Sequence, residues 1–241
     1  MEALGLITAR GGSISIPKKS ITPLMGRPLL AYTCDAALAS TKLDRVILST
    51  DDGEIASVGR ELGVEVPVMR PDELAEENTL ILPVIQHMVN WLMEHEGYVP
   101  DLLMLLQPTS PLRQAQHIDE SIRLIEESGA DCVVSVTPVP HQFNPVSVLS
   151  IVNGVLEPFL PGEGGRVQRR QDKPPAYARN GPAIYLGRTQ NLMKPDAHLY
   201  MGICRPYIME TQHSIDIDSY EDLAHAELII SRDGSGCKPL Q

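Results

Sequence analysis

The sequence lacks an excess of basic residues and any long hydrophobic run. Its 241 residues carry a formal net charge of -11, which argues against a nucleic-acid partner, because phosphate backbones attract proteins through clustered lysine and arginine. The densest apolar run, residues 102–106, is far shorter than the roughly 20 residues that cross a bilayer. The residues after Met1 also lack the charged and long apolar regions of a signal peptide. We therefore expect no nucleic-acid partner and no membrane association.

Cysteine is scarce, and its spacing excludes two common uses. No CxxC pair occurs, and the four cysteines are far apart in the sequence: Cys34, Cys132, Cys204 and Cys237. This spacing fits neither a zinc site nor the disulfide framework of a small secreted domain. A reducing, cytoplasmic location is therefore expected.

The first 136 residues contain short apolar runs that alternate with longer amphipathic stretches. Apolar runs bounded by polar or turn residues predict strands at 4–8, 45–50, 64–69, 102–106 and 131–136. Apolar residues at helical spacing predict helices at 28–40, 52–62, 79–96 and 115–127. This order predicts an α/β, Rossmann-like fold with a mostly parallel sheet flanked by helices. In such a sheet, ligands bind at the carboxyl ends of the strands.

The pattern changes after residue 136. Residues 137–182 are rich in proline and glycine, and one Asn-Gly pair favours a tight hairpin turn at 152–155. Regular structure is expected to return after this stretch, with strands at 183–186 and 200–209 and a helix at 219–230.

These elements are expected to form one domain, residues 1–232, because a chain of this size can bury one substantial core. Residues 137–182 contain too little regular structure to be a self-sufficient domain, so they are predicted to protrude from this domain. Residues 233–241 are predicted to be a flexible tail.

A glycine-rich loop directly follows the first expected strand, with the sequence ARGGSISIPKKSI at 9–21. Glycines let backbone N–H groups approach a phosphate closely, and Arg10, Lys18 and Lys19 would supply the countercharge. The loop lacks both the GxxxxGK[ST] pattern of a Walker A motif and the GxGxxG pattern of a dinucleotide site. These residues alone therefore predict either a phosphate-bearing ligand or an ordinary solvated basic turn.

The loop resembles the ARGGSKGIPKKNI signature of the CMP-sialic acid synthetase family, also called the acylneuraminate cytidylyltransferases. Similar segments recur in the family's order and cover almost the whole chain except the tail: STDDGEIASVGRELGVEV at 49–66, MRPDELA at 69–75, LLQPTSPLR at 105–113, RRQDKPPAYARNGPAIY at 169–185 and SIDIDSYEDLAHAE at 214–227. Enzymes of that family transfer CMP from CTP to an acidic sugar and release pyrophosphate. The resemblance therefore implies a cytidylyltransferase that activates a sialic-acid-like nonulosonic acid.

The resemblance also implies roles for individual residues. The implied nucleotide-binding residues are Arg10, Gly11, Gly12, Ser13, Lys19, Ser20 and Arg70. The implied acceptor-binding residues are Gln107, Arg170, Arg179 and Tyr185. Asp216 and Asp218, in the SIDID motif, are implied to bind Mg²⁺, a cation that prefers hard carboxylate oxygens. Together with Arg10 and Lys19, they are the implied catalytic residues.

A homodimer is implied as well, in which the protruding segment reaches the neighbouring subunit and Arg170 contacts the carboxylate of the acceptor. Three positions depart from the family pattern: Ile14 replaces a lysine, Ser20 replaces an asparagine, and Pro182 interrupts NGAIY. These departures leave open another acidic 2-keto sugar or a phosphonate as the acceptor. More distant alternatives are a DxD metal-dependent glycosyltransferase and a non-catalytic nucleotide-binding module.

Overall fold

The centre of the computed structural model is a mixed β-sheet. The structure describes residues 1–13, 15–160, 169–181 and 183–232. Across these residues the strand order is β11-β6-β10-β5-β1-β4, and β9 pairs with the far end of β6. Only β10 opposes the common direction of this path, because it is antiparallel to both of its neighbours. The strands are β1 (Ala3–Thr8), β4 (Arg45–Ser49), β5 (Leu102–Leu106), β6 (Cys132–Pro138), β9 (Tyr177–Arg179), β10 (Tyr185–Arg188) and β11 (Cys204–Ile208).

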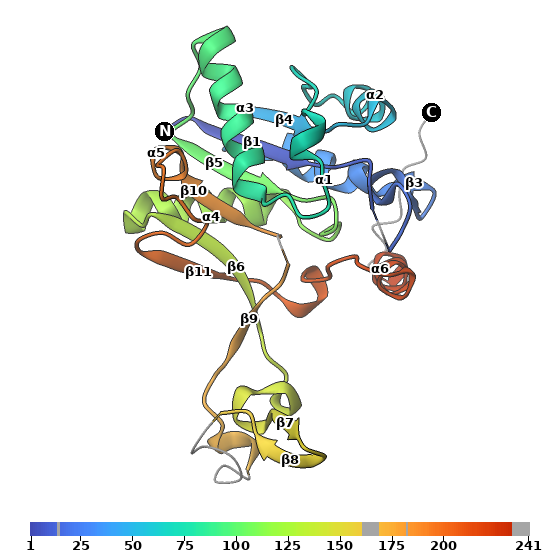
Figure 1. Ribbon diagram of the computed structural model, residues 1–241, viewed down its shortest axis with the longest axis vertical. Coiled ribbons are helices and arrows are strands. Elements are labelled where there is room, and N and C mark those ends of the chain that lie inside the picture. The colour runs from blue at the N-terminus through green and yellow to red at the C-terminus, as the bar shows by residue number, and fades with distance from the viewer. Residues whose placement is uncertain (14, 161–168, 182, 233–241) are drawn as a thin grey trace.

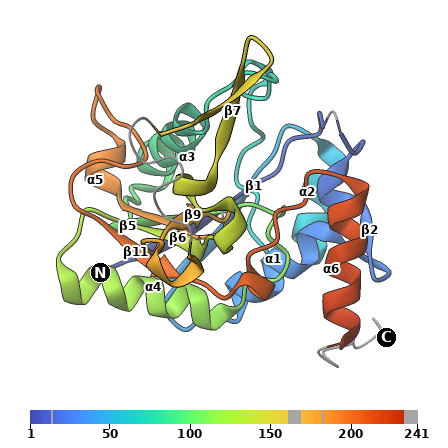
Figure 2. The same ribbon diagram turned by 90° about the horizontal axis from the view of Figure 1, so that it is seen from below.

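Helices cover both faces of this sheet, which confirms the Rossmann-like α/β prediction (Figures 1 and 2). Along β1, Leu4 and Leu6 pack on the face that carries α3, whereas Ile7 packs on the opposite face with residues of α1, α2 and α4. This alternation follows the two-residue period of a strand. The helices are α1 (Leu29–Leu38), α2 (Gly53–Glu61) and α4 (Ala115–Ser128) on one face, and α3 (Ile81–Glu96) and α5 (Thr189–Leu192) on the other.

The last described helix, α6 (Tyr220–Arg232), packs beside β2 and the residues that follow the opening loop (Figure 2). Its Leu223 and Ile230 share a buried cluster with Ile16 and Ile217. The short strands β2 (Pro23–Leu24) and β3 (Arg27–Pro28) lie next to this cluster, to which Leu24 contributes. This packing brings the opening loop against the segment that carries the SIDID motif.

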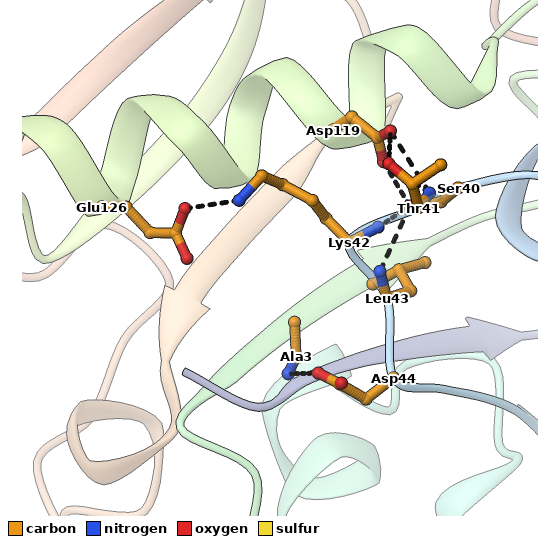
Figure 3. Close-up of polar contacts among 8 residues, drawn as sticks. All are labelled: Ala3, Ser40, Thr41, Lys42, Leu43, Asp44, Asp119 and Glu126. Atoms are coloured by element: carbon orange, nitrogen blue, oxygen red, sulfur yellow. Dashed lines mark hydrogen bonds and ion pairs between the residues drawn. The ribbon is translucent and has the colours of Figure 1, made fainter.

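Helix α4 fixes the connection between α1 and β4 (Figure 3). The Asp119 carboxylate accepts hydrogen bonds from the Ser40 hydroxyl at 2.5 Å and from the Thr41 hydroxyl at 2.6 Å. Burial opposes ionisation of Asp119, but these hydrogen bonds outweigh it and hold its pKa below the usual value. Lys42 of the same connection forms an ion pair with Glu126 at 2.7 Å.

The segment after β6 extends away from the sheet along paired β6 and β9 (Figure 1). At its far end β7 (Leu149–Val152) and β8 (Val155–Pro158) form the predicted hairpin. Asn153 and Gly154 both have positive φ, as a type I′ turn requires. Several apolar side chains of this segment are exposed: Phe143, Leu149, Ile151, Val155, Leu156, Phe159 and Tyr177.

Three expected strands differ from those observed. Residues 64–69 form no strand; their Glu65 makes an isolated bridge to β4, and Pro67, which has no N–H to donate, follows two residues later. The strand expected at 183–186 is β10, two residues further on, and the one expected at 200–209 is shortened to β11. Short 3₁₀ helices complete the described structure: η1 (Lys19–Ile21), η2 (Asp72–Leu74), η3 (His141–Phe143), η4 (Pro145–Ser147), η5 (Arg170–Asp172) and η6 (Thr211–His213).

Some sequence predictions concern residues outside the described part of the chain. These are the departures at Ile14 and Pro182 and the tail at 233–241. Among the helices that the structure describes, none combines the length and the apolar character needed to span a bilayer.

Candidate active site

A cavity of about 340 Å³ lies at the carboxyl ends of β1 and β5. We call it the cationic cavity, because Arg10, Lys19 and Arg70 line it. All the predicted nucleotide-binding residues except Gly11 take part in its wall. The predicted site residues found there are Arg10, Gly12, Ser13, Lys19, Ser20, Arg70, Gln107 and Asp218.

The opening loop is held against the start of α2 by its first glycine. The Gly11 backbone N–H donates to Asp51 at 3.0 Å, and a Cβ atom at Gly11 would lie 2.9 Å from the side chain of Asp52. Asp52 caps α2 by accepting from the backbone N–H groups of its first turn. Gly11 therefore supports the loop, whereas Gly12 lines the cavity and would have open space at its Cβ position.

The two consecutive lysines of the loop point to different partners. Lys18, which has a left-handed backbone with φ of 49°, pairs with Glu54 of α2 and does not line the cavity. The Lys19 ammonium group instead donates to the Ile217 carbonyl at 2.8 Å and to the Asp218 carboxylate at 3.0 Å. Lys19 thus joins the opening loop to the SIDID segment, with its side chain only 13% exposed.

Arg70 is a buried cation in the cavity wall, 6% exposed. Its guanidinium group donates to the Ser49 hydroxyl at 3.1 Å and to the Ser49 carbonyl at 2.7 Å. Burial lowers its pKa to about 10, so it remains charged at neutral pH. Neither Arg70 nor Arg10 takes part in an ion pair within the described residues. Although carboxylates also line the cavity, Arg10 and Arg70 have none within ion-pair distance, and such cations suit an anionic ligand.

A second cavity of about 490 Å³ adjoins the first, because Ile81 and Gln107 line both. We call it the tyrosine cavity, since Tyr185 and Tyr200 line it together with Arg179. The Arg179 guanidinium donates to the Tyr200 hydroxyl at 2.6 Å and lies 5.2 Å from the centre of its ring. The rings of Tyr185 and Tyr200 make an edge-to-face contact at 6.0 Å. Three of the four predicted acceptor-binding residues are therefore together.

The fourth, Arg170, is elsewhere in the chain's own fold. It lies in η5 of the protruding segment and lines a separate cavity of about 430 Å³ with His141 and Lys173. Its assignment to an acceptor stays a prediction.

Asp216 and Asp218 are separated by one residue in the SIDID motif, and Asp218 lines the cationic cavity. Burial raises the pKa of Asp216, and the charge of Asp218 adds to this effect. Gly181, which lines the tyrosine cavity, packs directly on Asp216: a Cβ atom there would lie 2.4 Å from the carboxylate oxygen Oδ2. Asp216 is therefore linked to the tyrosine cavity through Gly181, whereas Asp218 lines the cationic cavity itself.

Carboxylate oxygens are ligands that Mg²⁺ prefers, and in this structure the Asp218 carboxylate is paired with Lys19. Two mutually repelling carboxylates gain from a shared cation, and Mg²⁺ is usually held by one or two carboxylates together with phosphates and water. Within the described ranges, no group of three or more His, Cys, Asp or Glu residues is arranged to hold a metal ion. The remaining ligands would therefore have to come from a substrate and from water.

Sequence reasoning missed two polar networks that support the site. Fully buried Arg113 donates to the carbonyls of Ala183 at 2.8 Å and Gln107 at 3.2 Å, and thereby fixes the loop that carries Gln107. Asn180 accepts from Ser135 at 2.6 Å and donates to Ser214 at 2.9 Å. Arg113 ends the motif LLQPTSPLR, and Asn180 lies in the motif RRQDKPPAYARNGPAIY. The residues around them in the sequence do not indicate that these two polar side chains are buried.

Missed residues also line the two cavities. Glu76 and Glu77 line the cationic cavity, and the Glu76 carbonyl accepts from Arg10 at 3.0 Å. Leu199 and Tyr200 line the tyrosine cavity. No sequence pattern distinguished them, because they come from loops whose path depends on the whole fold.

Comparison with known proteins agrees with this geometry. Residues 4–229 match the profile of the family described as Cytidylyltransferase. The CMP-N,N'-diacetyllegionaminic acid synthase of Legionella pneumophila is 28% identical over 231 residues, which are 95% of this chain and 97% of that protein. The N-acylneuraminate cytidylyltransferase of Escherichia coli is 31% identical over 225 residues, which are 92% of this chain and 50% of that protein. The chain thus spans about half the length of that second relative.

A solved structure supports the fold. The structure of a CMP:2-keto-3-deoxy-manno-octonic acid synthetase complexed with CTP superposes with a TM-score of 0.70 at 16% identity. The match covers 97% of this chain and 100% of the other. Since the family profile extends over nearly the whole sequence, the chain belongs to the cytidylyltransferase family.

Proposed function

We propose that this protein transfers CMP from CTP to a sialic-acid-like nonulosonic acid and releases pyrophosphate. The observation that carries the proposal is the meeting of two cavities at Gln107, one cationic and one containing Arg179. A triphosphate suits the cationic cavity, and an acidic sugar suits the second. The names of the Legionella and Escherichia relatives, a legionaminic acid synthase and an acylneuraminate cytidylyltransferase, support this pairing of substrates.

In the cationic cavity, Arg10, Lys19 and Arg70 neutralise and position the triphosphate. The anomeric hydroxyl of the acceptor forms a bond to the α-phosphorus, the bond from that phosphorus to the bridging oxygen breaks, and pyrophosphate leaves. Lys19 is the best placed of the three for the charge that develops during transfer, because its contacts to Ile217 and Asp218 hold the ammonium group in place before substrate binds. Such preorganised charge lowers the barrier without reorganisation during the reaction.

Asp216 and Asp218 would hold Mg²⁺ in this scheme. When bound, the cation supplies charge neutralisation on the phosphates. Gly181 packs on the carboxylate of Asp216, and the Asn180 network holds the segment that begins at Ser214. A reaction that consumes CTP also supports the cytoplasmic location expected from the cysteine content.

The acceptor is tested directly by a panel of nonulosonic acids, an octulosonic acid and a phosphonate, each with CTP and Mg²⁺. Mass detection of the CMP conjugate identifies the acceptor, and pyrophosphate release gives the rate. We expect turnover with a nonulosonic acid and its loss in Lys19→Ala. Turnover restricted to the octulosonic acid or the phosphonate would replace the proposed acceptor and keep CTP. Absence of pyrophosphate release with every acceptor would overturn the transferase proposal.

We further propose that the protruding segment, residues 137–182, completes the acceptor site of a second copy in a homodimer. The exposed apolar side chains of the β7–β8 hairpin support an interface there, and Arg170 belongs to the same segment. Lys19→Ala and Arg170→Ala chains, each nearly inactive, are refolded together in equal amounts. Random pairing gives mixed dimers in half of the cases, each with one intact site, so recovery should approach about one quarter of wild-type activity. No recovery despite verified mixing would contradict the arrangement.

A further inference from the structure

Two cysteines that are 72 residues apart in sequence lie directly opposite each other in the sheet. Cys132 begins β6 and Cys204 begins β11, and they are register partners in this parallel pair. Adjacent strands lie about 4.8 Å apart, which is within the Cα separation of about 4.4–6.8 Å that a disulfide requires. Directly opposite residues in a parallel pair point to the same face of the sheet, so the two thiols are side by side.

The two thiols differ in access. Cys132 is 2% exposed, whereas Cys204 is exposed on the edge strand of the sheet. Burial raises the pKa of the Cys132 thiol, and the neighbouring Cys204 raises it further. Cys204 is therefore the group that an oxidant in solution reaches first, and Cys132 is the protected partner that can resolve the product.

Cys132 of this dithiol also contacts a residue that is next in sequence to the wall of the tyrosine cavity. The Cys132 thiol donates to the Met201 carbonyl at 3.8 Å, and Met201 directly follows Tyr200. Tyr200 in turn accepts a hydrogen bond from Arg179. On its other side, Cys132 pairs with Gly187 of β10. The Tyr185 hydroxyl packs on Gly187, because a Cβ atom at Gly187 would lie only 3.1 Å from it.

We propose that Cys132 and Cys204 form a reversible, peroxide-sensitive disulfide that controls the shape of the tyrosine cavity. The Cys204 sulfur attacks hydrogen peroxide and forms a sulfenic acid, with loss of one water. The Cys132 sulfur then attacks the Cys204 sulfur, forms the S–S bond and displaces the second water. Two electrons pass from the thiols to the peroxide, and a dithiol reductant reverses the step.

Oxidation removes the S–H group that Cys132 donates to Met201. The Met201 carbonyl then loses its partner, and the connection that holds Tyr200 against Arg179 is loosened. If the tyrosine cavity binds the acceptor, as the proposed function holds, oxidation weakens acceptor binding. CTP binding is unaffected, because the cationic cavity contains neither cysteine.

The test uses the full-length chain in a Cys237→Ser background, which removes one competing thiol. Reduced protein is treated with hydrogen peroxide and then with dithiothreitol. We expect a loss of two mass units, a proteolytic fragment that links Cys132 to Cys204, and faster amide hydrogen exchange in residues 200–203. All three changes should reverse on reduction and be absent from Cys204→Ser, an exposed and conservative control.

The kinetic readout is the KM for the acceptor, which should rise at least about threefold on oxidation while the KM for CTP stays unchanged. Oxidation of Cys204 to a sulfinic acid without the linked fragment would overturn the disulfide. A linked fragment with unchanged hydrogen exchange in residues 200–203 would overturn the coupling to the cavity, and this readout needs no turnover. The disulfide is thus tested even if no acceptor in the panel reacts. An equal rise in acceptor KM in Cys204→Ser would assign the effect to another residue.

Discussion

Replacing Gly181 with alanine should impair the carboxylate pair while leaving the fold intact. A Cβ atom at Gly181 would lie 2.4 Å from Oδ2 and 2.6 Å from Cγ of Asp216, although Cβ atoms do not approach other heavy atoms within 3.0 Å. The carboxylate must therefore move by at least about 0.6 Å. Groups that act in catalysis have to be held within about 0.5 Å of their productive position, so this displacement is large enough to matter.

Gly129→Ala provides a matched control, because Gly129 has the same φ of +65° but no atom within 4 Å of its Cβ position. Both substitutions place a side chain in the left-handed region, at a cost of about 1–2 kcal/mol. For a chain of this size that cost lowers Tm by about 2–4 °C per kcal/mol. Gly129→Ala should therefore show the backbone cost alone, and Gly181→Ala should lose at least as much stability because of its clash with Asp216. Gly181→Ala alone should lose about tenfold to a hundredfold in kcat.

The assay measures pyrophosphate release at saturating CTP and acceptor over a Mg²⁺ titration, beside thermal unfolding of each variant. Gly181→Ala should also need more Mg²⁺ for half-maximal rate. Wild-type kcat in Gly181→Ala, with the expected loss of stability, would refute a catalytic role for the position of Asp216. Equal losses of kcat in the two variants would show that destabilisation alone explains the effect.

Three further predictions concern charged groups. Lys19→Ala should reduce turnover at least about a hundredfold. Lys18→Ala loses only an ion pair with Glu54 outside the cavity and should reduce turnover less than about tenfold. Equal effects on turnover would contradict the different roles of the two lysines. Asp218→Asn should raise the Mg²⁺ concentration for half-maximal rate, since an amide is a weaker ligand, and an unchanged titration would place the metal elsewhere. Burial lowers the pKa of His117 to about 4. The unfolded chain therefore binds more protons between about pH 4 and 6.5, so the free energy of unfolding should decrease as the pH is lowered through this window, by at most about 1.4 kcal/mol per pH unit. A urea unfolding series in which His117→Gln keeps the full slope would contradict this.

Local sequence signals predicted the elements well where one stretch of chain decides the structure. The helix expected at 115–127 is α4, and Gly129 ends it with positive φ. The strand expected at 102–106 is β5. The Asn-Gly pair at 153–154 makes the predicted hairpin turn. Each depends on periodicity or turn chemistry within a few residues, which a single sequence contains in full.

The sequence by itself also determined the family, because the motifs occur in order along the chain, and the same motifs predicted which residues form the site. Residues of the opening loop, Gln107 and Asp218 do line one cavity. What the motifs did not determine was the direction of each side chain. Lys18 and Lys19 are neighbours in the sequence, but they point in different directions. Packing of the loop against α2 turns Lys18 away from the cavity, and packing of Ile16 against Ile217 turns Lys19 towards it.

Only the tertiary structure decided which distant residues become neighbours. The four cysteines gave no pattern in the sequence, yet the strand order of the sheet places Cys132 and Cys204 opposite each other. The reversal of β10 between β5 and β6 likewise brings Tyr185 beside the loop that carries Tyr200. Such contacts depend on how strands are ordered and aligned across the sheet, and that arrangement is selected by burial of the whole core rather than by the residues around any one cysteine or tyrosine.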